Sequence, residues 1–145
     1  MKTQMSLSLI AGLLFSFSAH AQKTTITTAE LPAKAQAFLK EHFANENPAS
    51  IVKDKETFST DYKVRFSNNT EVEFDSKGNW EEIDGNHTPI PTTTIPAKIA
   101  SYVKSNYKEV SITKIDKGHW GYEVDLSNGI ELEFDSNGKF LRIDN

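Results

Sequence analysis

The sequence of 145 residues contains no cysteine. This absence excludes disulfides, thiolate metal sites, catalytic thiols and a lipid-anchored cysteine after a leader. Long apolar runs are also missing, since no stretch after residue 21 approaches the roughly 20 residues that a membrane-spanning helix needs. Stability must therefore come from ordinary burial of apolar side chains, and we expect no membrane insertion.

Basic residues are outnumbered by acidic ones, because 16 Lys and Arg stand against 20 Asp and Glu for a formal net charge of −4. Nucleic acids and anionic membranes attract proteins that are rich in Lys and Arg. The charge balance therefore argues against both as partners. It favours a basic partner, a cation, or solubility alone.

Familiar catalytic motifs are missing too. The sequence contains no G-x-S-x-G elbow, no H-E-x-x-H pair and no glycine loop that could cradle a phosphate. The histidines after residue 21 are His42, His87 and His119, and their neighbours lack metal-ligand spacing. We therefore expect no enzyme and no cofactor, and we assign no catalytic or metal-binding residue.

The first 21 residues have the pattern of an export signal. Lys2 precedes the apolar run LSLIAGLLFSFSA, which leads into the small-x-small cleavage sequence AHA ending at Ala21. The mature chain is predicted to begin at Gln22. Its predicted destination is the periplasm or the outside of the cell.

One sequence motif is present twice in the chain. VEFDSKGNWEEID runs from Val72 to Asp84, and LEFDSNGKFLRID follows 60 residues later. The segments LPAKAQAFLKEHF and IPAKIASYVKSNY are related in the same way at an offset of 64, so a loop has shortened by four residues in the second copy. We predict two tandem units, residues 22–84 and 95–145, joined by a linker at 85–94.

Each unit is expected to begin with a helix that starts at a proline, Pro32 or Pro96, because the fixed φ of proline suits the first helical turn. Apolar residues follow at the i, i+3, i+4, i+8 spacing of one buried helix face. These residues are Ala35, Phe38, Leu39 and Phe43 in the first helix and Ile99, Tyr102, Val103 and Tyr107 in the second.

After each helix, apolar and polar residues alternate, which is typical of strands with one buried face. The turn sequences SNN, SNG, DSKGN and DSNGK separate these strands. In the last two we expect Asp75 and Asp135 to accept bonds from the turn backbone rather than to ligate calcium. The predicted fold class is α+β, with two units of a helix and a four-stranded antiparallel meander forming one helix-covered sheet.

The LPAK helix, the Y-x-V-x-F/L-S-N strand, the E-x-E-F-D-S-x-G hairpin and the final I-D strand together resemble the PepSY-like family of beta-lactamase-inhibitor-like proteins. The resemblance covers nearly all of the predicted mature chain. It implies an exported protein of tandem units, with a fold like that of the secreted beta-lactamase inhibitor proteins. It implies no enzymatic activity and no catalytic residue.

The charges of the two hairpins differ. If Phe66 faces Val72, then Arg65 opposes Glu73, which is a neutralising cross-strand pair. The equivalent register in the second hairpin sets Asp125 opposite Glu133, so that like charges face each other.

The second hairpin also sets Glu123 opposite Asp135 in this register, with Glu131 beside them. Such an acidic surface is either a solvated face, screened by salt, or a docking patch for a basic segment or a cation. Trp120 precedes the hairpin. The rarity of fully exposed tryptophan favours a role in capping an edge of the core, whereas an exposed aromatic residue near charge would suit a binding surface.

Our leading hypothesis is an exported, non-enzymatic module that holds a protein or peptide partner, basic in character, on its sheet face. The predicted contacts are Glu123, Asp125, Glu131, Glu133 and Trp120. One alternative is an inhibitor of a secreted or periplasmic hydrolase, a peptidase or beta-lactamase, which would use the turns Asn68–Thr70 and Ser127–Gly129. A second alternative is a cation sensor that uses the same acids.

Overall fold

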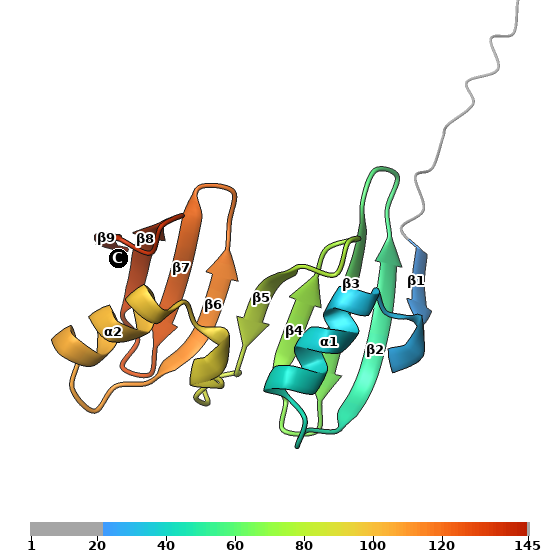
Figure 1. Ribbon diagram of the computed structural model, residues 1–145, viewed down its shortest axis with the longest axis horizontal. Coiled ribbons are helices and arrows are strands. Elements are labelled where there is room, and N and C mark those ends of the chain that lie inside the picture. The colour runs from blue at the N-terminus through green and yellow to red at the C-terminus, as the bar shows by residue number, and fades with distance from the viewer. Residues whose placement is uncertain (1–21, 145) are drawn as a thin grey trace, which may run out of the picture.

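The computed structural model describes residues 22–144 (Figure 1). The predicted export signal and its cleavage site lie outside the described residues. The helices are α1 (Ala33–His42) and α2 (Ala97–Asn106), each preceded by a short 3-10 turn. The strands are β1 (Gln22–Thr25), β2 (Pro48–Lys55), β3 (Thr60–Phe66), β4 (Glu71–Phe74), β5 (Trp80–Asp84), β6 (Ile112–Lys117), β7 (Gly121–Leu126), β8 (Glu131–Asp135) and β9 (Phe140–Asp144).

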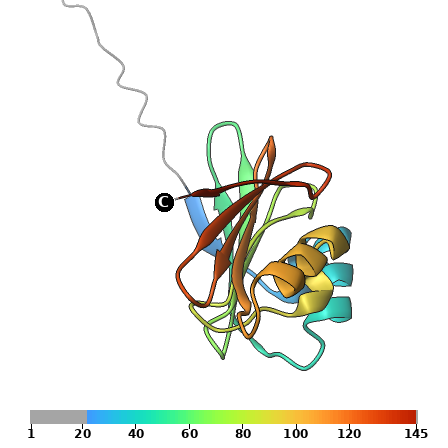
Figure 2. The same ribbon diagram turned by 90° about the vertical axis from the view of Figure 1, so that its left-hand side faces the viewer.

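The nine strands form one open sheet in which the spatial order follows the chain order and every neighbouring pair is antiparallel. Both helices lie on the same face of this sheet (Figure 2). A helix followed by four strands is present twice, as α1 with β2–β5 and as α2 with β6–β9. The predicted helix-covered antiparallel sheet is therefore confirmed, whereas the exact limits of the two units stay a prediction.

The short strand β1 was not predicted from the sequence. Its four residues are polar and exposed, so it carries no alternating apolar pattern. It pairs along the outer edge of β2, with Gln22 opposite Lys55.

The helices bury the predicted apolar stripes against the sheet. Ala35 and Ile99 are fully buried, and the other predicted residues are buried or half-buried. Pro32 and Pro96 lie one position earlier than predicted, because each has an extended ψ and caps its helix instead of sitting in the first turn. No helix within residues 22–144 is both long and apolar enough to cross a membrane.

The core continues across the junction between the two halves of the chain. Ile83 of β5 lies opposite Ile115 of β6, and both side chains are fully buried. Trp80 extends this contact, because its ring lies 6.3 Å from that of Tyr122 on β7. Burying one such aliphatic side chain contributes about 1.5–3 kcal/mol, so this seam joins the halves into one structure.

The aspartates of the turns after β4 and β8 close those turns, as predicted. Asp75 accepts hydrogen bonds from the backbone N–H groups of Lys77 and Asn79 at 2.8 and 2.9 Å. Asp135 accepts the equivalent two bonds in the other half, both at 2.9 Å. Gly78 takes the left-handed conformation that these turns require, with φ 80°.

The predicted register of the β3–β4 hairpin is wrong by two residues. The N–H of Phe66 donates to the carbonyl of Thr70 at 2.9 Å, so Thr70 belongs to the ladder and is not part of the loop. The connection consists of residues 67–69, and Asn69 provides the positive φ of 68° that closes it. Leu126 and Ile130 make the same closing bond at 2.9 Å in the β7–β8 hairpin.

Candidate functional site

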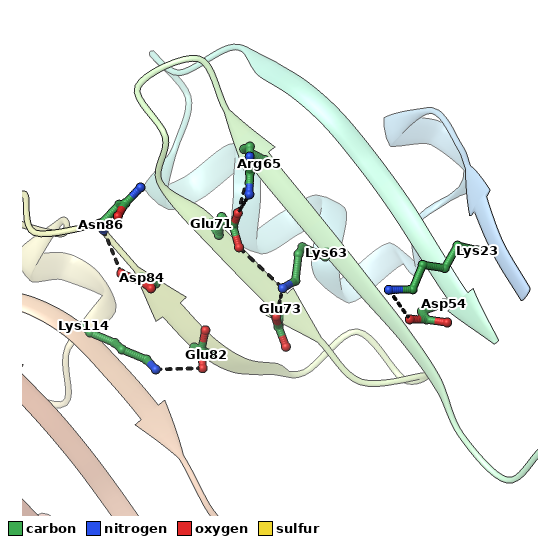
Figure 3. A network of polar contacts seen from close by, with 10 residues as sticks. All are labelled: Lys23, Asp54, Lys63, Arg65, Glu71, Glu73, Glu82, Asp84, Asn86 and Lys114. Carbon is green, nitrogen blue, oxygen red and sulfur yellow. Dashed lines mark hydrogen bonds and ion pairs between the residues drawn. The ribbon is translucent and has the colours of Figure 1, made fainter. Parts of the chain in front are cut away.

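The first hairpin, β3–β4, carries a neutralised set of charges on the sheet face away from the helices (Figure 3). The guanidinium of Arg65 donates to the carboxylate of Glu71, with Nε at 2.6 Å. The ammonium of Lys63 lies 2.5 Å from Glu73 and 3.5 Å from Glu71. Opposite charges that face each other across strands stabilise a sheet.

The second hairpin, β7–β8, has acids where the first has bases. The residues 60 positions after Lys63 and Arg65 are Glu123 and Asp125. The acids across from these positions are retained, as Glu131 and Glu133.

The observed register replaces the predicted partners in this hairpin. Asp125 faces Glu131 instead of Glu133, and Glu123 faces Glu133 instead of Asp135. The cause is that residues 127–129 form the connection and Ile130 joins the ladder, because the N–H of Leu126 donates to the carbonyl of Ile130. Like charges still oppose each other in both pairs, so the predicted acidic character of this face is retained.

Three carboxylates converge on this face. Oxygens of Glu123, Asp125 and Glu131 all lie within 4.8 Å of one another, and we call these residues the acidic triad. Within residues 22–144, no Lys or Arg ammonium or guanidinium nitrogen lies within 4.0 Å of a triad carboxylate. The triad is thus a concentrated negative charge without a direct ion-pair partner in the described chain.

Glu133 is not a member of the triad, and its carboxylate already has an ion-pair partner. The guanidinium of Arg142 on β9 donates to Glu133 at 2.6 Å. The four predicted contact acids therefore divide into three that converge and one that is neutralised by a neighbouring strand.

The environment of Glu123 and Asp125 disfavours the charged forms of these two carboxyls. Partial burial raises the pKa of Glu123, and the nearby carboxylates of Glu131 and Asp116 raise it further. Partial burial also raises the pKa of Asp125, against the opposing effect of the Lys114 ammonium. That ammonium lies 3.1 Å from Glu82, so it is engaged elsewhere (Figure 3). A cation bound at the triad would relieve this unfavourable charge.

Trp120 lies in the turn between β6 and β7 and is 85% exposed. It is not a member of the triad, but a shallow hollow of about 190 Å³ is lined by Trp120, Glu123 and Glu133 together. The predicted aromatic contact is therefore adjacent to the acidic face and open to solvent.

Sequence reasoning missed two surface features. Phe58, in the turn between β2 and β3, is fully exposed, and its position three residues after Lys55 matches that of Trp120 after Lys117. A hollow of about 630 Å³ also lies beside α2 and is lined in part by Tyr107. The first feature could have been found by aligning the two turns, whereas the second depends on how α2 packs over the start of β6.

The structure defines a small α+β protein, with two helices on one face of an open antiparallel sheet and the acidic triad on the other face. The chain belongs to the PepSY-like family. The family model described as "Putative beta-lactamase-inhibitor-like, PepSY-like" matches residues 60–142. No curated protein matches the sequence.

Three solved structures are similar to this chain over nearly their whole length. One is "a putative calcium-regulated periplasmic protein" from Bacteroides thetaiotaomicron, 41% identical with a TM-score of 0.81, covering 85% of this chain and 97% of its own. The second is described as a periplasmic protein of the DUF2874 family from Bacteroides vulgatus, 36% identical with a TM-score of 0.79, covering 85% and 97%. The third, a periplasmic protein of unknown function from Bacteroides vulgatus, is 36% identical with a TM-score of 0.79 and covers 86% and 100%.

Proposed function

We propose that this protein is a non-enzymatic periplasmic binding protein whose acidic triad binds calcium. The observation that carries the proposal is the convergence of carboxylate oxygens of Glu123, Asp125 and Glu131 within 4.8 Å. The export signal predicted at residues 1–21 and the periplasmic descriptions of three similar structures support the location.

The triad oxygens lie close enough together to ligate one Ca²⁺. Oxygens that ligate one Ca²⁺ at about 2.3–2.6 Å can lie up to about 5 Å apart, whereas for Mg²⁺ at about 2.0–2.1 Å the limit is about 4 Å. The triad oxygens all lie within 4.8 Å of one another, which satisfies the calcium limit. Mg²⁺ is less suited to this open face because it demands near-ideal octahedral geometry and gives up its water reluctantly. Water would complete the coordination on this open face.

The charges of the first hairpin support the binding of a cation at the equivalent place in the second hairpin. Lys63 and Arg65 put positive groups beside Glu71 and Glu73, at the positions where the triad has only acids. A bound Ca²⁺ would replace the charge of those two side chains. The similar Bacteroides thetaiotaomicron protein is described as calcium-regulated, which favours calcium among the divalent cations.

Three carboxylates on an open sheet form a weak site. We expect a Kd of about 10⁻⁴–10⁻³ M, the range of extracellular calcium modules. At about 10 mM calcium, such a site raises the free energy of unfolding by about 1.4–2.7 kcal/mol.

The proposal is tested by thermal unfolding of the purified protein in calcium, magnesium or sodium chloride at matched ionic strength. We expect calcium to raise Tm by several degrees, magnesium to raise it less and sodium to leave it unchanged. The matched control is the variant Glu123→Lys/Asp125→Arg, which has the charges of the first hairpin. A Tm that calcium leaves unchanged, or a calcium response of equal size in the control variant, contradicts the proposal.

A basic segment of a protein partner is a second candidate ligand for the same face. The ion pair of Arg142 with Glu133 supports a guanidinium ligand on this face, and the exposed Trp120 lines the same shallow hollow as Glu133. Capture from an envelope extract tests this candidate. We expect a partner that is retained at low salt, released at moderate salt and lost with Trp120→Ala. Identical retention by wild type and variant would exclude this surface.

We also infer that residues 22–84 and 95–145 are tandem copies joined by the linker 85–94, which the two sequence offsets and the twice-used element order support. Hydrolase inhibition through the turns Asn68–Thr70 and Ser127–Gly129 stays a prediction. Inhibition of a peptidase or beta-lactamase panel at micromolar concentration would support it.

A further inference from the structure

The two outer edges of the sheet differ in character. The edge at β1 carries only polar residues, from Gln22 to Thr25. The edge at β9 carries Leu141 and Ile143, which are 54% and 45% exposed. An edge strand presents unpaired backbone N–H and C=O groups, and proteins protect such edges with polar and charged residues. The β9 edge is therefore the one suited to pairing.

In the first half of the chain, β5 corresponds to β9, and its outer edge is paired with β6. Ile83 of β5 is 60 residues before Ile143, and pairing with Ile115 of β6 leaves it fully buried. The N–H of Gly85 donates across this seam to Thr113 at 2.8 Å, so the backbone groups of residues 83 and 85 face β6. By the same alternation, the backbone N–H and C=O of Ile143 face outward from β9.

We propose that β9 pairs antiparallel with β9 of a second copy of this chain, about a two-fold axis at Ile143. The sheets of the two copies then continue into each other. Each Ile143 lies opposite the Ile143 of the second copy, and Arg142 lies opposite the Asp144 of the second copy. Such a contact is self-complementary, as a two-fold interface requires.

Charge selects this register among the antiparallel alternatives. Moving the axis by one residue in either direction sets Arg142 opposite Arg142, or Asp144 opposite Asp144, and like charges directly opposite are destabilising. If the axis instead falls between two residues, Arg142 or Asp144 lies opposite Ile143. Residues on the helix-covered face of one copy then pair with residues on the charged face of the other copy. Only the register centred on Ile143 gives opposite charges on both sides of an apolar pair.

The seam between β5 and β6 has the same arrangement. Asp84, 60 residues before Asp144, faces Lys114 of β6 next to the paired isoleucines. In the dimer, Arg142 of the second copy takes the place of this lysine. The guanidinium of this Arg142 would also bring a positive charge toward the acidic face. Asp144, which it pairs with, lies opposite Glu131 in the β8–β9 register and contributes to the raised pKa of Glu123.

Sedimentation velocity of the purified protein tests the dimer. One strand pair buries less than a standard interface, so we expect monomer at about 5 µM and a measurable dimer fraction by about 500 µM. Ile143→Lys should weaken the dimer at least tenfold. The matched control Thr24→Lys, in the middle of the opposite edge, should leave it unchanged. A wild type that stays monomeric throughout, or a dimer that Ile143→Lys does not weaken, overturns the proposal.

A charge exchange tests the register itself. Arg142→Asp and Asp144→Arg should each abolish self-association, because each sets like charges opposite each other, whereas an equimolar mixture should form heterodimers. Melting curves check that both variants fold. Since Arg142→Asp also removes the bond to Glu133, Asp144→Arg, which removes no ion pair within residues 22–144, is the decisive single variant. Undiminished self-association of Asp144→Arg, or a mixture that stays monomeric, overturns the register.

Discussion

At the scale of single residues, two substitutions separate the charged surfaces of the two hairpins. Lys63 and Arg65 neutralise the β3–β4 hairpin, whereas Glu123 and Asp125 leave the β7–β8 hairpin acidic. The backbone register is the same in both, with Lys63 opposite Glu73 and Glu123 opposite Glu133. The difference in charge therefore arises from side-chain identity alone.

We predict that Glu123→Lys/Asp125→Arg stabilises the protein in the absence of divalent cations. It converts two like-charge cross-strand pairs into opposite-charge pairs, each worth a few tenths to about 1 kcal/mol. Urea unfolding should show a total gain of about 1 kcal/mol. The reverse exchange, Lys63→Glu/Arg65→Asp, should lower stability by a similar amount. A loss of stability in both variants would show that local packing outweighs charge.

The raised pKa values of Glu123 and Asp125 predict a pH dependence. Their folded pKa values lie above the ordinary values, so these carboxyls bind protons more readily in the folded than in the unfolded chain. Their contribution to stability rises as the pH falls through the raised pKa values toward about 4.

The variant Glu123→Gln/Asp125→Asn should remove this part of the pH dependence. It should be more stable than wild type at pH 7, and the difference should close as the pH approaches about 4. Urea unfolding at several pH values measures it. A stability difference that does not change with pH would assign no role to these two charges.

At the scale of the secondary-structure elements, the sequence predicted the parts that depend on local periodicity. The stripe through Ala35 and Leu39 marked α1, and the alternation through Val64 and Phe66 marked β3. The hairpin register was not predictable, because it depends on whether Thr70 joins the loop or the ladder. The bond from the N–H of Phe66 to the carbonyl of Thr70 places Thr70 in the ladder, and alternation of apolar and polar residues fits either register.

The glycines of the turns provide a prediction at this scale. Gly78 and Gly129 both have a positive φ, but a Cβ on Gly78 would lie 2.8 Å from the backbone nitrogen of Ala35 and 2.9 Å from Cβ of Pro32. A Cβ on Gly129 meets no heavy atom within 4 Å.

We expect Gly129→Ala to cost about 1 kcal/mol through its left-handed backbone alone. Gly78→Ala should cost about 1–3 kcal/mol more, because the added methyl group displaces the start of α1. Urea unfolding of both variants measures the difference. Equal costs would indicate that the turn moves away from α1 freely.

At the scale of the whole molecule, the candidate site is a product of strand pairing. The sequence named Glu123, Asp125, Glu131 and Glu133 as a group, but it could not show which of them converge. Arg142 arrives from β9 to neutralise Glu133, and Lys114 from β6 is held by Glu82. These contacts depend on side-chain placement across four strands, which sequence spacing does not encode.

The seam between the halves predicts that the protein unfolds as one unit. Ile83→Ala should cost about 3 kcal/mol by opening a cavity in the continuous core, whereas Ile143→Ala at the open edge should cost under about 1 kcal/mol. Circular dichroism and Trp80 fluorescence, in a Trp120→Phe background, should report one coincident urea transition. Two separated transitions would show that the halves fold independently.

Calcium binding at the acidic triad is the central claim, and a calcium titration followed through backbone amide NMR shifts tests it most directly. The β3–β4 hairpin provides the control within the same molecule. We predict saturable shifts at residues 123–131 up to about 10 mM calcium and none of comparable size at residues 63–71. Unchanged shifts at residues 123–131, or equal shifts in both hairpins, would contradict the account.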